Sequence, residues 1–91
     1  MATTYILRCR DNRFYIGSAM NFEKRLQDHF RGKCKFTKSR LPVVPVHIEE
    51  YSNHKAARKR EFEIKDRKSR KYIENLIKLS LKALSSSGLG Q

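Results

Sequence analysis

The chain lacks the features that mark membrane and secreted proteins. No apolar run approaches the ~18 residues of a membrane-spanning helix, so no segment is expected to cross a bilayer. The N-terminus has neither the basic start nor the long apolar stretch of a secretory signal. Only two cysteines are present, Cys9 and Cys34, and with three histidines they form no recognisable zinc pattern. We therefore expect a reduced, cytoplasmic protein that has no membrane partner.

Acidic residues are scarce. Nine Asp and Glu stand against 21 Lys and Arg, which gives a formal net charge of +12 on 91 residues. This imbalance raises self-repulsion in the compact state and is typical of proteins that bind a polyanion. The basic residues do not fall on one amphipathic helix with a broad apolar face, which argues against a membrane surface. Nucleic acid is the expected partner.

Glycine is also rare, and the four glycines form no Gly-rich phosphate-binding loop. The chain length suits one small domain without room for a second core. Hydrophobic content of 38% indicates that this domain folds. We expect a single domain over residues 1–84 and a flexible tail over 85–91, where "SSSGLGQ" has turn formers and little to bury.

Two alternating apolar runs, over residues 3–9 and 13–18, predict a pair of strands joined by the loop Arg10-Asp11-Asn12. A three-residue loop needs a residue in the left-handed conformation, which Asn12 tolerates. It pairs Leu7 with Tyr15 and Tyr5 with Gly17, so both tyrosines share one face. A two-residue loop would place them on opposite faces. We predict the three-residue loop.

The remaining pattern predicts helices over about 22–31, 54–67 and 70–84, and a third strand within 43–52. Asn21 is a suitable N-cap for the first helix, whose predicted apolar stripe is Phe22, Leu26 and Phe30. Residues 31–42 have the composition of a basic loop. Pro45 indicates an edge position or a bulge in the third strand. The predicted fold is α/β in the α+β sense: a small three-stranded, mainly antiparallel sheet flanked by about three helices.

Several residues admit both a structural and a chemical interpretation. Tyr5 and Tyr15 are by default core aromatics. Gly17 indicates a close backbone approach or unusual dihedrals. Arg25 and His29, four apart on a predicted helix, are either a functional pair or part of a solvated face.

Glu61 is a stronger signal because it falls on the same helical stripe as Ala57 and Ile64. An unpaired carboxylate facing a core is costly. The residue therefore either carries chemistry or forms an ion pair with a neighbouring Arg or Lys.

Together these residues resemble the GIY-YIG nuclease family. The likeness rests on Tyr5 in "TYI", "YIG" at 15–17, Arg25 eight residues after that glycine, His29 one turn later, and Glu61 in a later helix. It extends to the segment from Gly32 to Thr37 and to "KREFEIK", and covers roughly residues 3–80, as in small stand-alone members. The first motif departs from the family name, because Thr3-Thr4 precede Tyr5. This departure concerns strand packing more than chemistry.

The resemblance implies a metal-dependent DNA endonuclease, a phosphodiester hydrolase of low sequence specificity that acts in DNA repair or recombination. Glu61 would bind one Mg²⁺ or Mn²⁺, and Tyr5 would be the general base, its phenolate favoured by nearby cations. Tyr15 would orient water or lower the Tyr5 pKa. Arg25 would neutralise phosphoryl charge, and His29 would hydrogen-bond the phosphate, Tyr5 or the water. Supporting positions would be Ser18 and Asn75.

Residues expected to contact the nucleic acid are mostly basic. They are Gly17, Lys33, Lys35, Phe36, Lys38, Arg40, Lys55, Arg58, Lys59 and Arg60. Phe36 either stacks on an unpaired base, which would favour single-stranded or branched DNA, or covers the core. Two other functions stay open at this point: a non-catalytic nucleic-acid-binding protein, and a catalytic subunit that needs a protein partner.

Overall fold

The predicted hairpin forms with the register of the three-residue loop. The computed structural model describes residues 1–89, and the side chains of residues 1–80. Strand β1 (Ala2–Arg8) pairs antiparallel with β2 (Phe14–Ala19), which places Tyr5 opposite Gly17 and Tyr15 opposite Leu7. Asn12 has φ 68, in the left-handed region. The predicted register is confirmed, and both tyrosines lie on one face of the sheet.

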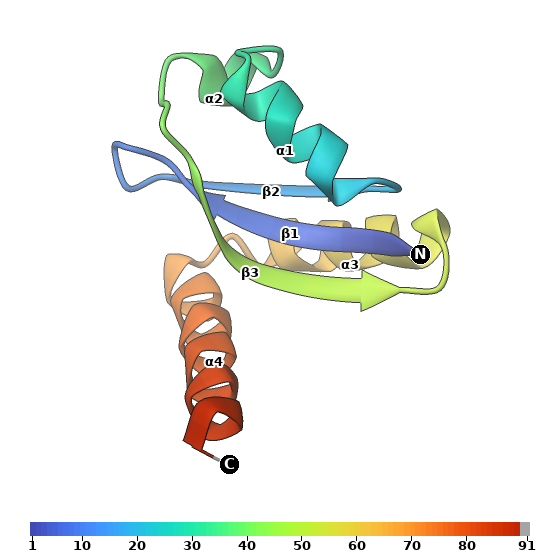
Figure 1. Cartoon of the computed structure of the whole chain (residues 1–91), viewed down its shortest axis with the longest axis vertical. Helices are drawn as coiled ribbons and strands as arrows, with labels where there is room; N and C mark the ends of the chain where they lie inside the picture. Colours follow the sequence, from blue (N-terminus) through green and yellow to red (C-terminus); the bar gives the residue numbers. More distant parts are fainter. Residues whose placement is uncertain (90–91) are drawn as a thin grey trace.

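The sheet has the order β2-β1-β3 and is antiparallel throughout (Figure 1). Strand β3 (Val44–Tyr51) pairs with β1, so β2 and β3 are the two edges. Ile6 pairs with His47 and Leu7 with Pro45, which leaves Val46 as the extra residue of a bulge. Both predictions from Pro45, an edge position and a bulge in the third strand, are therefore confirmed.

Helices cover both faces of the sheet: α1 and α2 lie on one side and α3 on the other (Figure 1). Their bounds are α1 Phe22–Phe30, α2 Lys35–Lys38, α3 His54–Arg67 and α4 Arg70–Leu89. The α+β prediction is confirmed, but α2 lies where a basic loop was expected, and α4 is longer than predicted. The division into a domain and a tail stays a prediction, and residues 90–91 lie outside the described residues. Within the described part of the chain, no helix has the length and hydrophobicity to cross a membrane.

Two apolar clusters hold these layers together. On one face, Tyr5, Leu7 and the buried Cys9 pack with Phe22 and Leu26 of α1. On the other face, a second cluster joins β1 to α3 and α4 through Ile6, Ile64 and Ile73. The predicted stripe of α1 is wrong at its end, because Phe30 is half exposed while the polar His29 is buried.

Glu49 joins β3 to α3 through a polar network. Its carboxylate accepts hydrogen bonds from Arg60 Nε at 2.9 Å, from the Tyr51 hydroxyl at 2.6 Å and from His47. Burial alone would raise the pKa of Glu49, but these donors outweigh it and lower the pKa to about 2. Arg60 therefore joins β3 to α3, and the expectation that it also binds nucleic acid stays a prediction.

Candidate active site

Tyr5, Tyr15 and His29 form the centre of the candidate site. The Tyr5 hydroxyl lies 3.1 Å from His29 Nε2, and the ring centroids of Tyr15 and His29 are 4.9 Å apart, edge to face. Tyr5 and His29 are each only 1% exposed, whereas Tyr15 is half-buried. The hairpin and helix α1 therefore bring two phenols and an imidazole to one place, with Tyr15 on its solvent side.

Thr37 fixes the tautomer of His29. Its Oγ1 lies 2.8 Å from His29 Nδ1 and donates to the Cys34 carbonyl at 3.5 Å. A hydroxyl that donates to a carbonyl is left to accept from Nδ1–H, so Nε2 becomes the acceptor for the Tyr5 O–H. Burial, aided by the charge of Arg25, lowers the pKa of His29. The imidazole is neutral at pH 7 and able to take a proton.

Thr37 is a residue of the candidate site that the sequence alone does not predict. It ends the segment that begins at Gly32, which supports the family resemblance, but its position depends on α2. Because α2 has four residues, no periodic pattern reveals it.

Gly17 leaves the space that the two phenols occupy. A Cβ at this position would lie 2.6 Å from Tyr5 Oη, 2.8 Å from Tyr5 Cζ and 3.1 Å from Tyr15 Cε1. No side chain fits there without moving the phenol of Tyr5. Of the two expectations for Gly17, the close approach is the correct one.

Glu61 reaches the same edge of the sheet from α3. Its Oε1 accepts a 2.6 Å hydrogen bond from Ser18, the β2 residue next to Gly17, and its Oε2 pairs with Lys65 Nζ at 2.6 Å. The predicted ion pair is therefore present. Burial is the main cause that raises the pKa of both Tyr5 and Tyr15, and the Glu61 charge adds a smaller effect in the same direction across the edge strand.

The phenols are held in their protonated form. Burial is the main cause that raises the pKa of Tyr5, followed by Tyr15; the charge of Arg25 opposes both but is outweighed. Burial and a hydrogen bond with Cys34 raise the pKa of Tyr15 to about 12. The expectation that nearby cations favour a Tyr5 phenolate is wrong for the protein alone. Arg25 itself is exposed on α1 and acts on the phenols through its charge.

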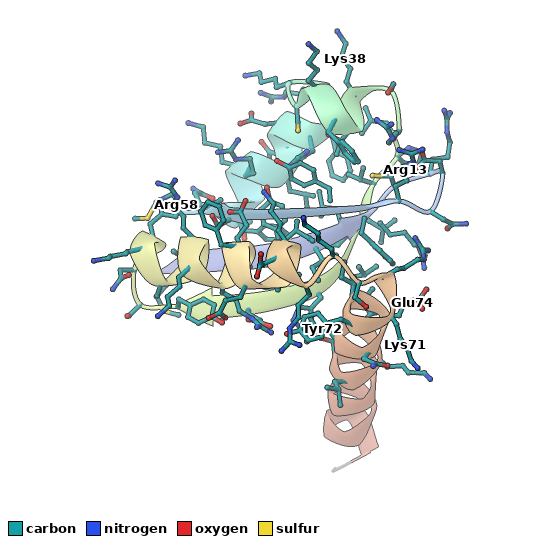
Figure 2. The ribbon with its side chains drawn as sticks, turned by 180° about the vertical axis from the view of Figure 1, so that it is seen from behind. Arg13, Lys38, Arg58, Lys71, Tyr72 and Glu74 are labelled. Atoms are coloured by element: carbon teal, nitrogen blue, oxygen red, sulfur yellow. The ribbon has the colours of Figure 1, made fainter. Side chains whose placement is uncertain are left out.

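The residues predicted to contact nucleic acid differ in how exposed they are and in whether they already pair with another residue. Lys35 and Lys38 are exposed on α2, and Lys55, Arg58 and Lys59 are exposed on α3 (Figure 2 labels Lys38 and Arg58). Lys33 is exposed but pairs with Asp28 at 3.7 Å.

Arg40 is more constrained. It pairs with Asp11 at 3.1 Å, and its guanidinium lies 4.4 Å from the centroid of the Phe36 ring. Phe36 is 37% exposed, and its ring centroid lies 5.8 Å from that of Tyr15. Asn75 is exposed on α4, and among residues 1–80 no hydrogen bond links its side chain to the site.

The donor set near Glu61 fits a hard divalent cation. A carboxylate and a serine hydroxyl supply oxygen ligands, which Mg²⁺ prefers while it keeps several waters. The Lys65 ammonium lies on one carboxylate oxygen, where a cation would replace it. Within the part of the chain whose side chains are described, no three His, Cys, Asp or Glu residues cluster as metal ligands.

The chain is similar to known proteins in sequence and in structure. The model of the GIY-YIG catalytic domain matches residues 1–73. UPF0213 protein SH2523 of Staphylococcus haemolyticus is 47% identical over 62 residues, 67% of this chain and 76% of that protein. A UPF0213 protein of Syntrophus aciditrophicus is 49% identical over 63 residues, 67% of this chain and 72% of the relative. The solution NMR structure of UPF0213 protein BH0048 from Bacillus halodurans superposes with a TM-score of 0.56 and 32% identity, covering 87% of this chain and 85% of that one.

Proposed function

The chain belongs to the GIY-YIG family, and from this premise we propose that it is a metal-dependent endonuclease that hydrolyses phosphodiester bonds in DNA. The observation that carries the proposal is the contact of the Tyr5 hydroxyl with His29 Nε2 beside Gly17. A buried phenol bonded to a neutral imidazole has a route by which it can lose its own proton while it accepts another. A core tyrosine needs no such partner held in one tautomer.

The proposed reaction begins with a water next to Tyr5. As the water oxygen forms a bond to phosphorus, its proton passes to Tyr5 Oη, and the phenolic proton passes to His29 Nε2. The bond from phosphorus to the leaving 3′ oxygen breaks, and that oxygen takes a proton from solvent. Because Tyr5 never exists as a free phenolate, its raised pKa is compatible with this relay.

Other residues stabilise charge during this step. Arg25 is exposed, close enough to lower the pKa of His29, and free to neutralise charge on the phosphoryl oxygens. Tyr15, on the solvent side of Tyr5, orients the water. Glu61 would hold the Mg²⁺ or Mn²⁺ beside Ser18, and the bound cation would polarise the phosphate and stabilise the leaving oxygen.

The proposal is tested with a cleavage panel of single-stranded, duplex, flap and junction DNA and RNA, in Mg²⁺, Mn²⁺ or EDTA. Glu61→Ala should lose cleavage and keep DNA binding. Glu63→Ala is the matched control, because Glu63 is exposed on the same helix and only joins Arg60 at 3.4 Å. If the wild type binds but never cuts, the chain is a nucleic-acid-binding protein instead. If it cuts only after a cellular partner is added, it is a catalytic subunit.

Tyr5→Phe tests the relay. The variant should fold with a loss of about 1 kcal/mol, because only one hydroxyl contact is removed. Turnover should fall to the background of Glu61→Ala under the same conditions. Substantial cleavage by Tyr5→Phe would show that another group is the base.

A further inference from the structure

A groove beside the edge strand β2 has no role in the chemistry described above. It has a volume of about 470 Å³, within the range of roughly 300–1,000 Å³ that is usual for small-ligand sites. Its lining comes from the hairpin loop and β2, from α2, and from the end of α3, the turn that follows it and the start of α4. The tip of the hairpin, where Arg13 is labelled, lies at the same end of the molecule as the start of α4 (Figure 2).

The floor of this groove is apolar and its rim is cationic. The apolar residues of the lining, called the floor below, are Phe14, Ile16, Phe36, Ile64 and Ile73. The charged residues of the lining are Arg13, Lys65, Lys68 and Arg70, with no carboxylate among them. Three of these cations pair with acidic residues beside the groove, Arg13 with Asp11, Lys65 with Glu61 and Arg70 with Glu74, whereas Lys68 forms no salt bridge within residues 1–80. A planar apolar group that carries negative charge at its margin is complementary to such a surface, and a nucleotide has this character.

Two lining residues connect the groove to the candidate active site. Lys65 lines the groove and pairs with Glu61 at 2.6 Å. Phe36 lines it and packs near Tyr15, with ring centroids 5.8 Å apart. A strand whose phosphate lies between Tyr5 and Glu61 therefore has a neighbouring nucleotide within reach of the groove.

From this continuity we infer that the groove binds one unpaired nucleotide next to the scissile phosphate, with the base on the apolar floor and its phosphates on the cationic rim. This inference rests on the proposed function for the position of the scissile phosphate. A base inside a duplex is stacked on both faces and cannot reach the floor. The substrate class is thus DNA with an unpaired stretch, either single-stranded or at a branch.

The position of the rim supports the assignment. The Arg70 guanidinium lies 4.6 Å from the centroid of the Phe14 ring, donates to the Asn12 carbonyl at 2.8 Å and pairs with Glu74 at 3.1 Å, so it is held at the Phe14 edge of the floor. Lys68 is exposed at the end of α3, in the left-handed conformation that turns the chain into α4. Together they place positive charge at the margin of the apolar surface.

Binding is measured in EDTA, so that no strand is cut. One probe is a single strand of eight thymidines; the other has the same eight phosphates but abasic sugars. Base contacts in such sites contribute enough that the abasic strand should bind about tenfold more weakly. Equal affinity for the two strands would overturn the inference, because phosphates alone would then account for binding.

Two charge reversals locate the effect. Lys68→Glu at the rim should weaken binding of the thymidine strand several times more than Lys78→Glu, an equal change on exposed α4 outside the groove. In a ¹⁵N–¹H titration with the thymidine strand, the backbone amides of Ile16 and Ser69 should shift in the wild type. If Lys68→Glu and Lys78→Glu behave alike, or if the chain sediments as a dimer that Lys68→Glu dissociates and Lys78→Glu does not, the inference fails.

The outcomes separate the two proposals. If the protein binds the abasic strand more weakly but shows no cleavage that depends on Glu61, the groove proposal stands and the nuclease proposal fails. If the protein cleaves DNA but binds both strands with equal affinity, the nuclease proposal stands and the groove proposal fails.

Discussion

The Tyr5 hydroxyl is subject to two opposing requirements. Its burial favours the neutral phenol and raises its pKa, whereas a general base must accept a proton. In the proposed relay the hydrogen bond to His29 reconciles them, because the imidazole would take the phenolic proton in the same step. A buried site that stays neutral before the reaction avoids the cost of an unpaired charge.

Gly17→Ala tests whether the space beside Tyr5 matters for activity. The added methyl would lie 2.6 Å from Tyr5 Oη, so the phenol must move and its bond to His29 must weaken. Displacement of a catalytic group by this much can cost about a hundredfold. We expect the rate constant for cleavage to fall by about that factor in a single-turnover assay. The circular dichroism spectrum should match that of the wild type, which would show that the variant is folded.

Gly32→Ala is the control for this change. Gly32 has φ +76, so alanine there is strained, with an expected loss of stability of about 1 kcal/mol. Its added Cβ approaches the Lys38 side chain at 3.4 Å and not the phenols. Cleavage by folded Gly32→Ala should match the wild type. If the two alanine variants lose activity equally, the effect of Gly17→Ala is not due to Tyr5.

The sequence predicts the position of a residue where a local rule of chain geometry applies. The three-residue loop fixes the strand register, and the register alone places Tyr5 and Tyr15 on one face opposite Gly17. The pairing of His29 with Thr37 escaped prediction because it depends on contacts between two helices. The protonation of Tyr5 does not follow from the sequence either, because its raised pKa results mainly from burial, which is a property of the packed protein.

At the level of elements, the short helix α2 supports the site from outside the sheet. It contributes the buried Thr37, and contacts between α1 and α2 bring that hydroxyl to His29. The strong N-cap and long periodic segments made α1 and α3 predictable, including Asn21. Hydrophobicity alone could not show that His29, and not Phe30, turns inward, because a buried histidine requires partners that lie elsewhere in the chain.

Thr37→Val removes the hydroxyl that holds the His29 tautomer and keeps the shape of the side chain. Nδ1–H would lose its partner, at a cost of about 1–3 kcal/mol. The imidazole can then place its proton on Nε2, where it no longer accepts from Tyr5. We expect a loss of cleavage of at least tenfold in Thr37→Val and recovery in Thr37→Ser, measured at matched folded fraction.

The pH profile distinguishes this role from packing. The lowered pKa of His29 means that wild-type cleavage should be constant near pH 7 and fall through a midpoint below pH 6.5, as the imidazole gains a proton. Thr37→Ser should keep that midpoint. If Thr37→Val cuts as fast as Thr37→Ser with the same profile, the hydroxyl only fills space.

At the level of the whole molecule, a net charge of +12 ensures attraction to nucleic acid but does not orient it. Orientation depends on which cations share a side with Glu61. On α3, Arg58 precedes Glu61 by one turn and lies on its side of the helix. Lys59, two residues before Glu61, points away from that side. Both are exposed, and they carry the same charge.

Arg58→Gln and Lys59→Gln should therefore differ although each removes one positive charge from the same helix. For single-stranded DNA, each phosphate contact contributes about 0.7 to the slope of log affinity against log salt. Arg58→Gln should flatten that slope by about 0.7 in fluorescence anisotropy titrations, and Lys59→Gln should leave it near the wild-type value. Equal slopes for the two variants would mean that the strand follows the net charge of the domain and not the side of α3 that carries Glu61. The path of the strand across β2 would then need another determinant.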